Sequence, residues 1–388
     1  MSLPIFHRTE LASRLADRIV SDKGASGIFL AALRRTGKST FIREDLAPVL
    51  RQRGADVIYV DLWADRAQDP GTLIARAIAE HLRGYEGIIT QMARKGGLES
   101  VTLGGVKLAL DKIGVGQGET LSRALQALSL ETRRLIVMVV DEAQHAQTTE
   151  AGNAAMYALK AARDELNSSA FSGFRLVATG SNRDKLAILV TGKDQAFLNA
   201  KLVDLPHLGQ DYLSWVQGRF NHAVKPSLAA LNDVFAQCSY RPEILTDVLD
   251  DLELELDLAS HNMDDHVHRR VRQKLLMYRQ AFIQIFDNLP TLQAAVMQTM
   301  AEMGQDFAAF KRTSMTRYAA ICSQRTAESV NVESTSVQYA LDALRDKQLV
   351  WKSARGVYAI EDSQHAAWLS GLPEDEVTAL AGIRLIDT

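Results

Sequence analysis

A glycine, a lysine and two hydroxyl residues follow one another between an apolar run and a helix-forming segment, and this arrangement constrains the fold more than any other part of the chain. Residues 27–31 (G-I-F-L-A) suit a buried strand of a parallel sheet, and residues 32–40 read A-L-R-R-T-G-K-S-T. In such a strand–turn–helix unit, the backbone N–H groups of the turn and the positive end of the helix hold phosphate groups. Lys38 then reaches the β- and γ-phosphates, Ser39 offers a hydroxyl to Mg²⁺, and Gly37 lets the backbone approach closely. The segment therefore predicts a binding site for a nucleoside triphosphate.

One position of this turn departs from the usual pattern. Ala32 stands where the motif normally begins with glycine, so the turn must keep backbone angles that an alanine tolerates. The prediction still places Arg35, Thr36 and Thr40 at the nucleotide, beside the three residues above. A glycine turn followed by a helix with hydroxyl residues at its start would give the same letters without a nucleotide, and these residues alone leave that alternative open.

Two acids follow a second apolar run. Residues 135–140 are all apolar and lead directly into Asp141 and Glu142, which is typical of a buried central strand. Ligand sites of open α/β sheets lie at the carboxyl edge of such strands. Asp141 is therefore predicted to hold Mg²⁺, and Glu142 to orient and activate a water molecule for γ-phosphate hydrolysis. Asp141 can equally cap a helix that begins near Ala143, and the two roles are compatible.

A third apolar strand, residues 174–180, ends in small polar residues. A polar side chain there can lie between the other strand ends and touch the γ-phosphate or the attacking water. Ser181 and Asn182 are both candidates for this catalytic sensor. Gly-Ser-Asn is also ordinary turn chemistry, so the choice between the two residues, and between sensor and turn, stays open.

These three segments, in this order, resemble the P-loop ATPases of the AAA+ and STAND group, especially the archaeal-type ATPases and, more distantly, origin-recognition initiators and transposition ATPases. The resemblance rests on residues 34–40, 141–144 and 179–181. It implies an α/β fold, in which a parallel sheet has helices on both faces and is followed by a helical lid and a C-terminal winged helix. It also implies that ATP and Mg²⁺ are bound between the sheet domain and the lid.

The rest of the chain divides in agreement with this resemblance. Residues 1–208 are predicted to form the P-loop ATPase domain, residues 209–272 the helical lid, and residues 273–388 the winged-helix domain. Within the first domain, strand and helix patterns alternate as in a doubly wound sheet. The glycine-richer residues 84–118 interrupt this alternation and predict a hairpin or a partner-binding insertion.

Arginines carry two further roles in relatives of this kind. An arginine at the start of a lid helix reads the γ-phosphate, and Arg241, which precedes Pro242, is the matching residue here, with an ordinary surface arginine as the alternative. An arginine just before the last core strand reaches the nucleotide of a neighbouring subunit. This chain offers Lys201 there, or Arg183 after the sensor turn, and a lysine lacks the forked guanidinium. Catalysis by an adjacent subunit, and with it oligomerisation, therefore stays open.

The C-terminal part predicts a helix over residues 334–344 and a hairpin over residues 349–360, which is typical of a winged helix. Lys352 and Arg355 in the wing would suit duplex DNA, but Asp342 and nearby acids dilute the charge. DNA binding and a protein-interaction role are therefore both retained.

Composition limits the function classes. The 388 residues carry 44 Lys and Arg against 47 Asp and Glu, a net charge of -3, so there is no overall basic bias toward nucleic acid or membrane. Cys238 and Cys322 lie far apart without metal-ligand spacing, which predicts free buried thiols in a reduced compartment. No run of about eighteen apolar residues predicts a membrane span, and we expect a cytoplasmic protein.

The prediction that combines these features is a regulatory ATPase. Binding and hydrolysis of Mg-ATP would switch the lid and the winged helix, with a protein partner and, as an open question, duplex DNA. The alternative is a nucleotide-stabilised adaptor or protein-interaction module that does not hydrolyse ATP. Ala32 and the missing arginine before the last core strand favour this alternative, whereas Glu142 favours hydrolysis.

Overall fold

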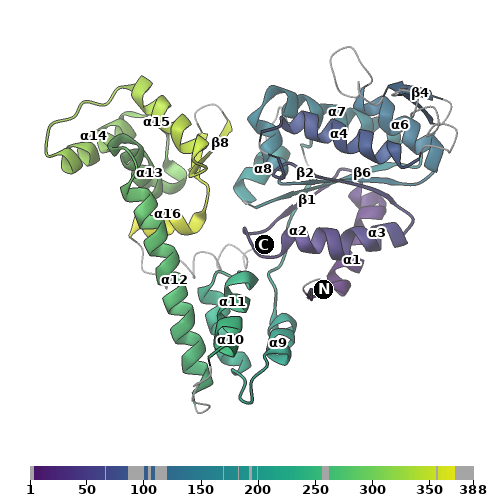
Figure 1. Ribbon diagram of the computed structural model, residues 1–388. Helices are drawn as coiled ribbons and strands as arrows, with labels where there is room; N and C mark the ends of the chain where they lie inside the picture. The colour runs from purple at the N-terminus through teal and green to yellow at the C-terminus, as the bar shows by residue number, and fades with distance from the viewer. Residues whose placement is uncertain are drawn as a thin grey trace. The chain divides into compact units, whose positions relative to one another are not determined.

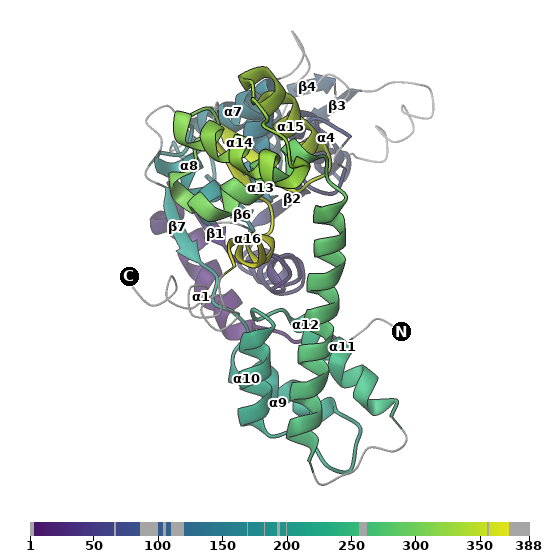
Figure 2. The same cartoon turned by 90° about the vertical axis from the view of Figure 1, so that its left-hand side faces the viewer.

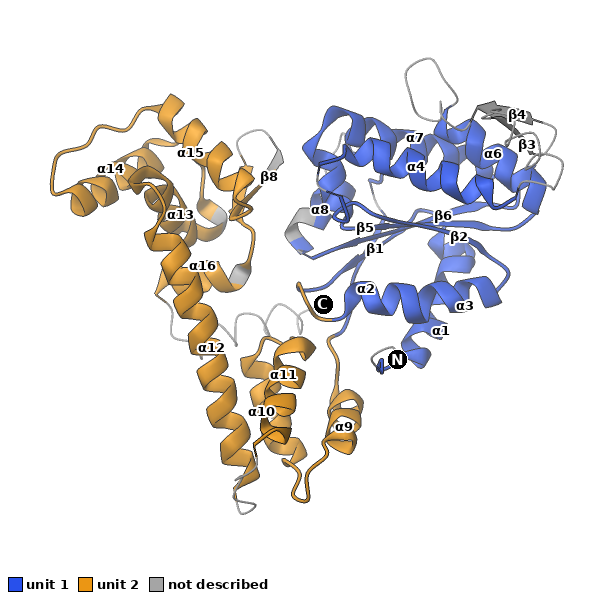
Figure 3. Cartoon of the chain, in the orientation of Figure 1, with its two compact units in different colours: residues 1–33, 37–206 blue, residues 34–36, 207–388 orange. Residues whose placement is uncertain are grey.

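The computed structural model describes two compact units. It covers residues 4–65, 67–85, 100–103, 106–109, 120–168, 170–181, 183–191, 195–198, 200–255, 262–354 and 357–371. The first unit comprises Met1–Leu33 and Gly37–Pro206, and the second comprises Arg34–Thr36 and His207–Thr388 (Figure 3). Each unit is described by itself.

The first unit is built on a five-stranded parallel sheet with the strand order β2-β5-β6-β1-β7. Its strands are β1 (Ile28–Ala31), β2 (Asp56–Asp61), β5 (Ile136–Asp141), β6 (Phe174–Gly180) and β7 (Lys201–Asp204). Parallel neighbours need crossover connections, and helices supply them. The predicted α/β fold is therefore confirmed.

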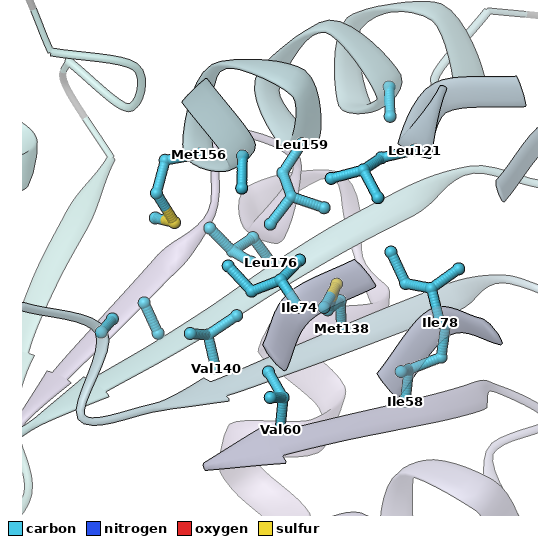
Figure 4. Packing of buried hydrophobic residues seen from close by; sticks show 14 of the residues in the cluster. Ile58, Val60, Ile74, Ile78, Leu121, Met138, Val140, Met156, Leu159 and Leu176 are labelled. Carbon is cyan, nitrogen blue, oxygen red and sulfur yellow. The ribbon is translucent and has the colours of Figure 1, made fainter. Parts of the chain in front are cut away.

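Helices cover both faces of this sheet (Figure 1). One face carries α1 (Thr9–Val20) and α3 (Ala47–Gln52), and the other carries α4 (Pro70–Arg83), α6 (Leu121–Thr132) and α7 (Glu150–Leu166). Residues of β5 alternate between the two cores: Val137 and Val139 pack with the α1 and α3 side, whereas Met138 and Val140 pack beneath α4 and α7 (Figure 4). Because both faces of the strand are buried, its sequence is apolar throughout.

The helix that follows β1 changes its winding twice. It begins as α2 (Lys38–Thr40), widens into a π-helical segment over Phe41–Leu46, and continues as α3. Pro48 in the first turn of α3 has no N–H for the carbonyl of Glu44, and its ring would collide with that carbonyl in a regular α-helix. The wider turn relieves this conflict. Asp45 in the same segment is buried and accepts hydrogen bonds from His7 Nδ1 (2.7 Å) and from the Arg8 amide (3.0 Å).

The predicted interruption contains a small antiparallel hairpin formed by β3 (Ser100–Leu103) and β4 (Val106–Ala109). The other positions between residues 86 and 119 lie outside the described residues. The unit also contains α8 (Arg183–Thr191), which follows β6.

The second unit begins with four helices: α9 (Gln210–Arg219), α10 (Leu228–Gln237), α11 (Pro242–Glu253) and the long α12 (Met263–Asp287). Helices α10 and α11 pack against the first half of α12 (Figure 2). Helix α12 runs without a break through residue 272, so the border that the sequence suggested between lid and C-terminal domain falls inside a helix.

The remaining elements share one core with the end of α12. They are α13 (Thr291–Met303), α14 (Arg312–Thr326), α15 (Ser334–Asp346), β8 (Val350–Ala354), β9 (Val357–Ile360) and α16 (Ser363–Ser370). Strands β8 and β9 form an antiparallel pair in which Val350 faces Ile360. The predicted helix-then-hairpin order is therefore present.

Both cysteines are free and buried, as predicted, and burial raises the pKa of Cys238 to about 12. Among the helices of the described chain, none combines the length and apolar character needed to cross a lipid bilayer.

Candidate nucleotide-binding site

The turn after β1 explains why alanine is tolerated at its first position. Ala32 donates its amide to the Gly180 carbonyl (3.1 Å), which continues the pairing of β1 with β6. Within residues 32–40, all of them described, the left-handed backbone angles fall at Arg35 (φ 62°) and Gly37 (φ 83°). Ala32 therefore needs no glycine-like conformation, and the permissive residue stands where α2 begins.

Lys38 is buried at the carboxyl edge of the sheet, with its side chain 5% exposed. Its ammonium pairs with Asp141 Oδ1 and lies 2.8 Å from Glu142 Oε1, and it also donates to Thr179 Oγ1 (3.1 Å). Burial disfavours the charge, but the two carboxylates outweigh burial and raise the pKa of Lys38. The structure thus brings Lys38 together with both acids that the sequence singled out.

Asp141 is fully buried at the end of β5 and is surrounded by donors. Its Oδ2 accepts hydrogen bonds from Ser39 Oγ (2.6 Å) and from the Tyr59 hydroxyl (3.0 Å), while Oδ1 accepts from Thr179 Oγ1. Burial opposes the carboxylate charge, yet Lys38 and these donors together lower the pKa of Asp141 to about 2. The carboxylate is therefore charged at neutral pH.

Glu142 follows in a left-handed conformation with φ 54°, which is uncommon for a residue with a side chain. Its Oε2 accepts hydrogen bonds from Gln144 Nε2 (2.6 Å), Ser181 Oγ (2.8 Å) and the Ser181 amide (3.2 Å). Burial would raise its pKa, but Lys38 and Gln144 hold it below the usual range. Ser181 thus contacts the acid predicted to activate water.

The oxygens of Ser39 and Asp141 are the kind of ligand that Mg²⁺ binds. Ser39 Oγ and Asp141 Oδ2 lie 2.6 Å apart at the strand edge, so both oxygens would be available as ligands of one divalent cation. Among the described residues, no cluster of three or more His, Cys, Asp or Glu side chains offers a metal site made by the protein alone.

The other predicted nucleotide contacts are distributed over both units. Thr40 is exposed on α2, whereas Thr36 is buried and belongs to the second unit. Arg35 also belongs to the second unit, where its Nη1 lies 2.9 Å from Glu243 Oε1. Asn182 lies outside the described residues.

Arg241 stands at the N-cap of α11, as the sequence predicted. Its side chain is 12% exposed, and Nη2 lies 3.3 Å from both carboxylate oxygens of Asp362. Of the candidates for an arginine near the last strand, Arg183 pairs with Asp204 on β7, and Lys201 is exposed on the same strand.

Three residues in the first unit's site were not predicted. Thr179 was part of the third segment but was not assigned a role, although a hydroxyl next to the end of an apolar strand is a usable signal. Gln144 enters the sequence argument only as the last of residues 141–144. Tyr59 has no distinguishing signal in the sequence, and its hydroxyl reaches Asp141 because β2 pairs with β5.

The parallel sheet and the lysine-acid grouping at its carboxyl edge define an α/β protein with a candidate phosphate-binding site. No protein-family model matches the chain, and no curated protein matches its sequence. Among solved structures, it is similar to the Walker-type ATPase of Pyrococcus abyssi, with a TM-score of 0.52 and 15% identity over 94% of this chain and 96% of that chain. It is also similar to the ORC2 protein of Aeropyrum pernix in its ADP form, with a TM-score of 0.50 and 15% identity over 98% of this chain and 95% of that chain. The chain thus shares the fold of these two proteins, and at this identity the similarity establishes the fold alone.

Proposed function

We propose that this protein is a regulatory ATPase that binds and hydrolyses Mg-ATP. The observation that carries the proposal is the grouping of Lys38, Ser39, Asp141 and Glu142 at one edge of the sheet, within hydrogen-bonding or ion-pairing distance of one another. Burying a lysine beside two carboxylates costs desolvation free energy. Such clusters of buried charged groups are found preferentially at functional sites. The similarity to a structure solved in an ADP form supports an adenine nucleotide.

Lys38 would bind the β- and γ-phosphates. Its ammonium is charged and buried, and its present partners are carboxylates. A phosphate group is also an anion that accepts hydrogen bonds, so ATP can take the place of part of this carboxylate shell without leaving the ammonium unpaired. Ser39 and Asp141 would hold Mg²⁺, which supplies positive charge to the phosphate oxygens as charge develops on them.

Glu142 would act as the general base. A water oxygen forms a bond to the γ-phosphorus while one water proton moves to the Glu142 carboxylate. The bond between the γ-phosphorus and its bridging oxygen breaks, and that electron pair leaves with ADP. The low pKa of Glu142 keeps the carboxylate free of its own proton at neutral pH.

Arg241 and Arg35 would be further contacts of the nucleotide. Each is now paired with a carboxylate, Asp362 for Arg241 and Glu243 for Arg35. A γ-phosphate that replaced Asp362 at Arg241 would make the second unit sensitive to whether ATP or ADP is bound. We therefore expect Arg241→Ala to reduce the difference between the affinities for ATP and ADP, measured by equilibrium binding.

The region from α13 to β9 would be a winged-helix domain that reports the nucleotide state to a protein partner or to duplex DNA. The support is the order of α13, α14 and α15 before the β8–β9 hairpin, all around one core. Fold does not establish a ligand, so the experiment below includes DNA as a variable.

The test is ATP turnover by the purified protein, with and without duplex DNA, beside Lys38→Ala and Glu142→Gln. Lys23→Ala serves as a control because Lys23 is an exposed lysine of the same unit. Turnover in the wild type and the control, with loss in both site variants and retained ATP binding in Glu142→Gln, supports the proposal. ATP binding without turnover in the wild type contradicts it and favours the nucleotide-bound adaptor. Stimulation by DNA would assign the winged helix to DNA.

A further inference from the structure

The two carboxylate oxygens of Glu142 have different surroundings. Oε2 accepts three hydrogen bonds, from Gln144 Nε2 (2.6 Å), Ser181 Oγ (2.8 Å) and the Ser181 amide (3.2 Å). Oε1 faces the ammonium of Lys38 at 2.8 Å. One oxygen is therefore held by fixed protein donors, whereas the other is paired with the side chain that would bind phosphate.

Gln144 is itself held in one arrangement. Its side chain is fully buried, and its Nε2 faces both the Glu142 carboxylate and Ser181 Oγ (3.5 Å). Because a carboxylate only accepts hydrogen bonds, the NH₂ end of the amide must face it. Gln144 Oε1 is left buried with no hydrogen-bond partner among the described residues. Leaving a buried acceptor unpaired costs stability, so this orientation of the amide is maintained at the expense of stability.

Gly180 provides the space for that oxygen. A Cβ added at Gly180 would lie 2.7 Å from Gln144 Oε1 and 3.1 Å from Leu186 Cδ1. The backbone of Gly180 is outside the left-handed region, so an alanine there would conflict with the neighbouring side chains and not with its own φ. Gly180 thus offers a way to displace the Gln144 amide without changing Gln144.

We infer that Gln144 and Ser181 are positioning residues that fix Glu142 Oε2, so that Oε1 is the oxygen that accepts the proton of the attacking water. Lys38 covers Oε1 until phosphate binding draws its ammonium away, which makes the base available only when a nucleotide is bound. This inference rests on the proposed ATPase activity and adds to it the residues that control its base. Ser181 then acts through Glu142 and has no need to touch the γ-phosphate.

The experiment is a double-mutant cycle with Gln144→Ala and Gly180→Ala, measured as kcat for ATP and as the equilibrium Kd for ATP. A misplaced base costs about 10- to 100-fold in rate. We expect each single variant to lower kcat by about that factor, while the Kd for ATP changes less than about twofold because neither residue would contact the nucleotide. In the double variant the two effects should not multiply, since both act on the same amide.

Two further variants separate positioning from a general structural role. Ser181→Thr keeps the hydroxyl and should retain more turnover than Ser181→Ala. Gln147→Ala removes a glutamine from the same short helical segment, Ala143–Thr148, and should leave kcat unchanged because no described contact joins Gln147 to Glu142. A general loss of folding would instead lower the thermal midpoint and ATP binding together.

The outcomes of these experiments separate the positioning role of Gln144 and Ser181 from the proposed ATPase activity on which it rests. Normal turnover in Gln144→Ala, or strictly multiplicative effects in the double variant, would overturn the positioning role while leaving the ATPase intact. No turnover in the wild type would overturn both. A parallel loss of kcat and ATP affinity in the Gln144 and Gly180 variants would show a structural role and would also overturn the inference.

Discussion

Replacing Lys38 with methionine removes the ammonium that faces both Asp141 and Glu142 and keeps much of the side-chain volume. Breaking a buried ion pair by removing one partner costs about 3–5 kcal/mol, because the remaining charge is left buried. Asp141 is fully buried but keeps the hydroxyl donors Ser39 and Tyr59. We therefore expect the lower end, about 3 kcal/mol, or a fall in Tm of roughly 6–12 °C for a unit of this size.

The stability of the Lys38→Met variant should change with pH in the opposite direction from that of the wild type. In the wild type the pKa of Asp141 is lowered from 3.8 to about 2, so its contribution to stability is present above 3.8 and is lost only as pH falls through about 2. Without Lys38, burial and mutual repulsion raise the pKa values of both acids. The folded variant then binds more protons than the unfolded chain, and its stability rises as pH falls.

Thermal unfolding of nucleotide-free wild type and Lys38→Met, at about pH 7.5 and about pH 5.5, measures this difference. The gap in Tm should be large at the higher pH and smaller at the lower one. Lys23→Met, at an exposed lysine, should change stability by less than about 0.5 kcal/mol at either pH. An equal gap at both pH values would refute the reasoning from unpaired buried carboxylates.

Three further substitutions test the packing and hydrogen bonding of single positions by urea unfolding. Tyr59→Phe removes the hydroxyl that donates to Asp141 Oδ2 (3.0 Å) and should cost roughly 1.5–3 kcal/mol; an unchanged midpoint would show that this bond is replaced by water. Gly152→Ala places a Cβ 2.3 Å from the Ala146 carbonyl oxygen, so we expect a loss of about 1–3 kcal/mol, and full stability would contradict the close approach. Gly218→Ala meets no atom within 4 Å in helix α9 and should stabilise that helix by about 0.5–1 kcal/mol; a loss there would be inconsistent with the open surroundings.

Local sequence signals were sufficient for the parts of the site that lie on single strand–turn–helix units. Gly37, Lys38 and Ser39 stand at the start of the helix after β1, and Asp141 and Glu142 stand at the end of β5, where the apolar run stops. An apolar run and the polar residues at its end are neighbours in sequence, so their spacing is readable without a fold. The helix over residues 334–344 and the hairpin that follows it were readable for the same reason.

Tertiary structure decided how those units are combined. Tyr59 lies on β2, Thr179 lies on β6 and Lys38 lies in the helix that follows β1. They meet at Asp141 because β5 pairs with β2 and β6, and β6 pairs with β1. Crossover connections set that order, and the residues within each strand do not encode it. The long α12 is a second example: its charged first half suggested a border near residue 272, but its buried residues Val267 and Val271 anchor it, and the helix continues to Asp287.

The sequence by itself thus determined the glycine turn after β1, the acidic strand end and the α/β class, because each depends on residues a few positions apart. Only the tertiary structure decided that Glu142 has one oxygen held by Gln144 and Ser181 and the other paired with Lys38. Those contacts join residues that are up to about a hundred positions apart, and they exist because strand pairing brings separate turns to one edge of the sheet.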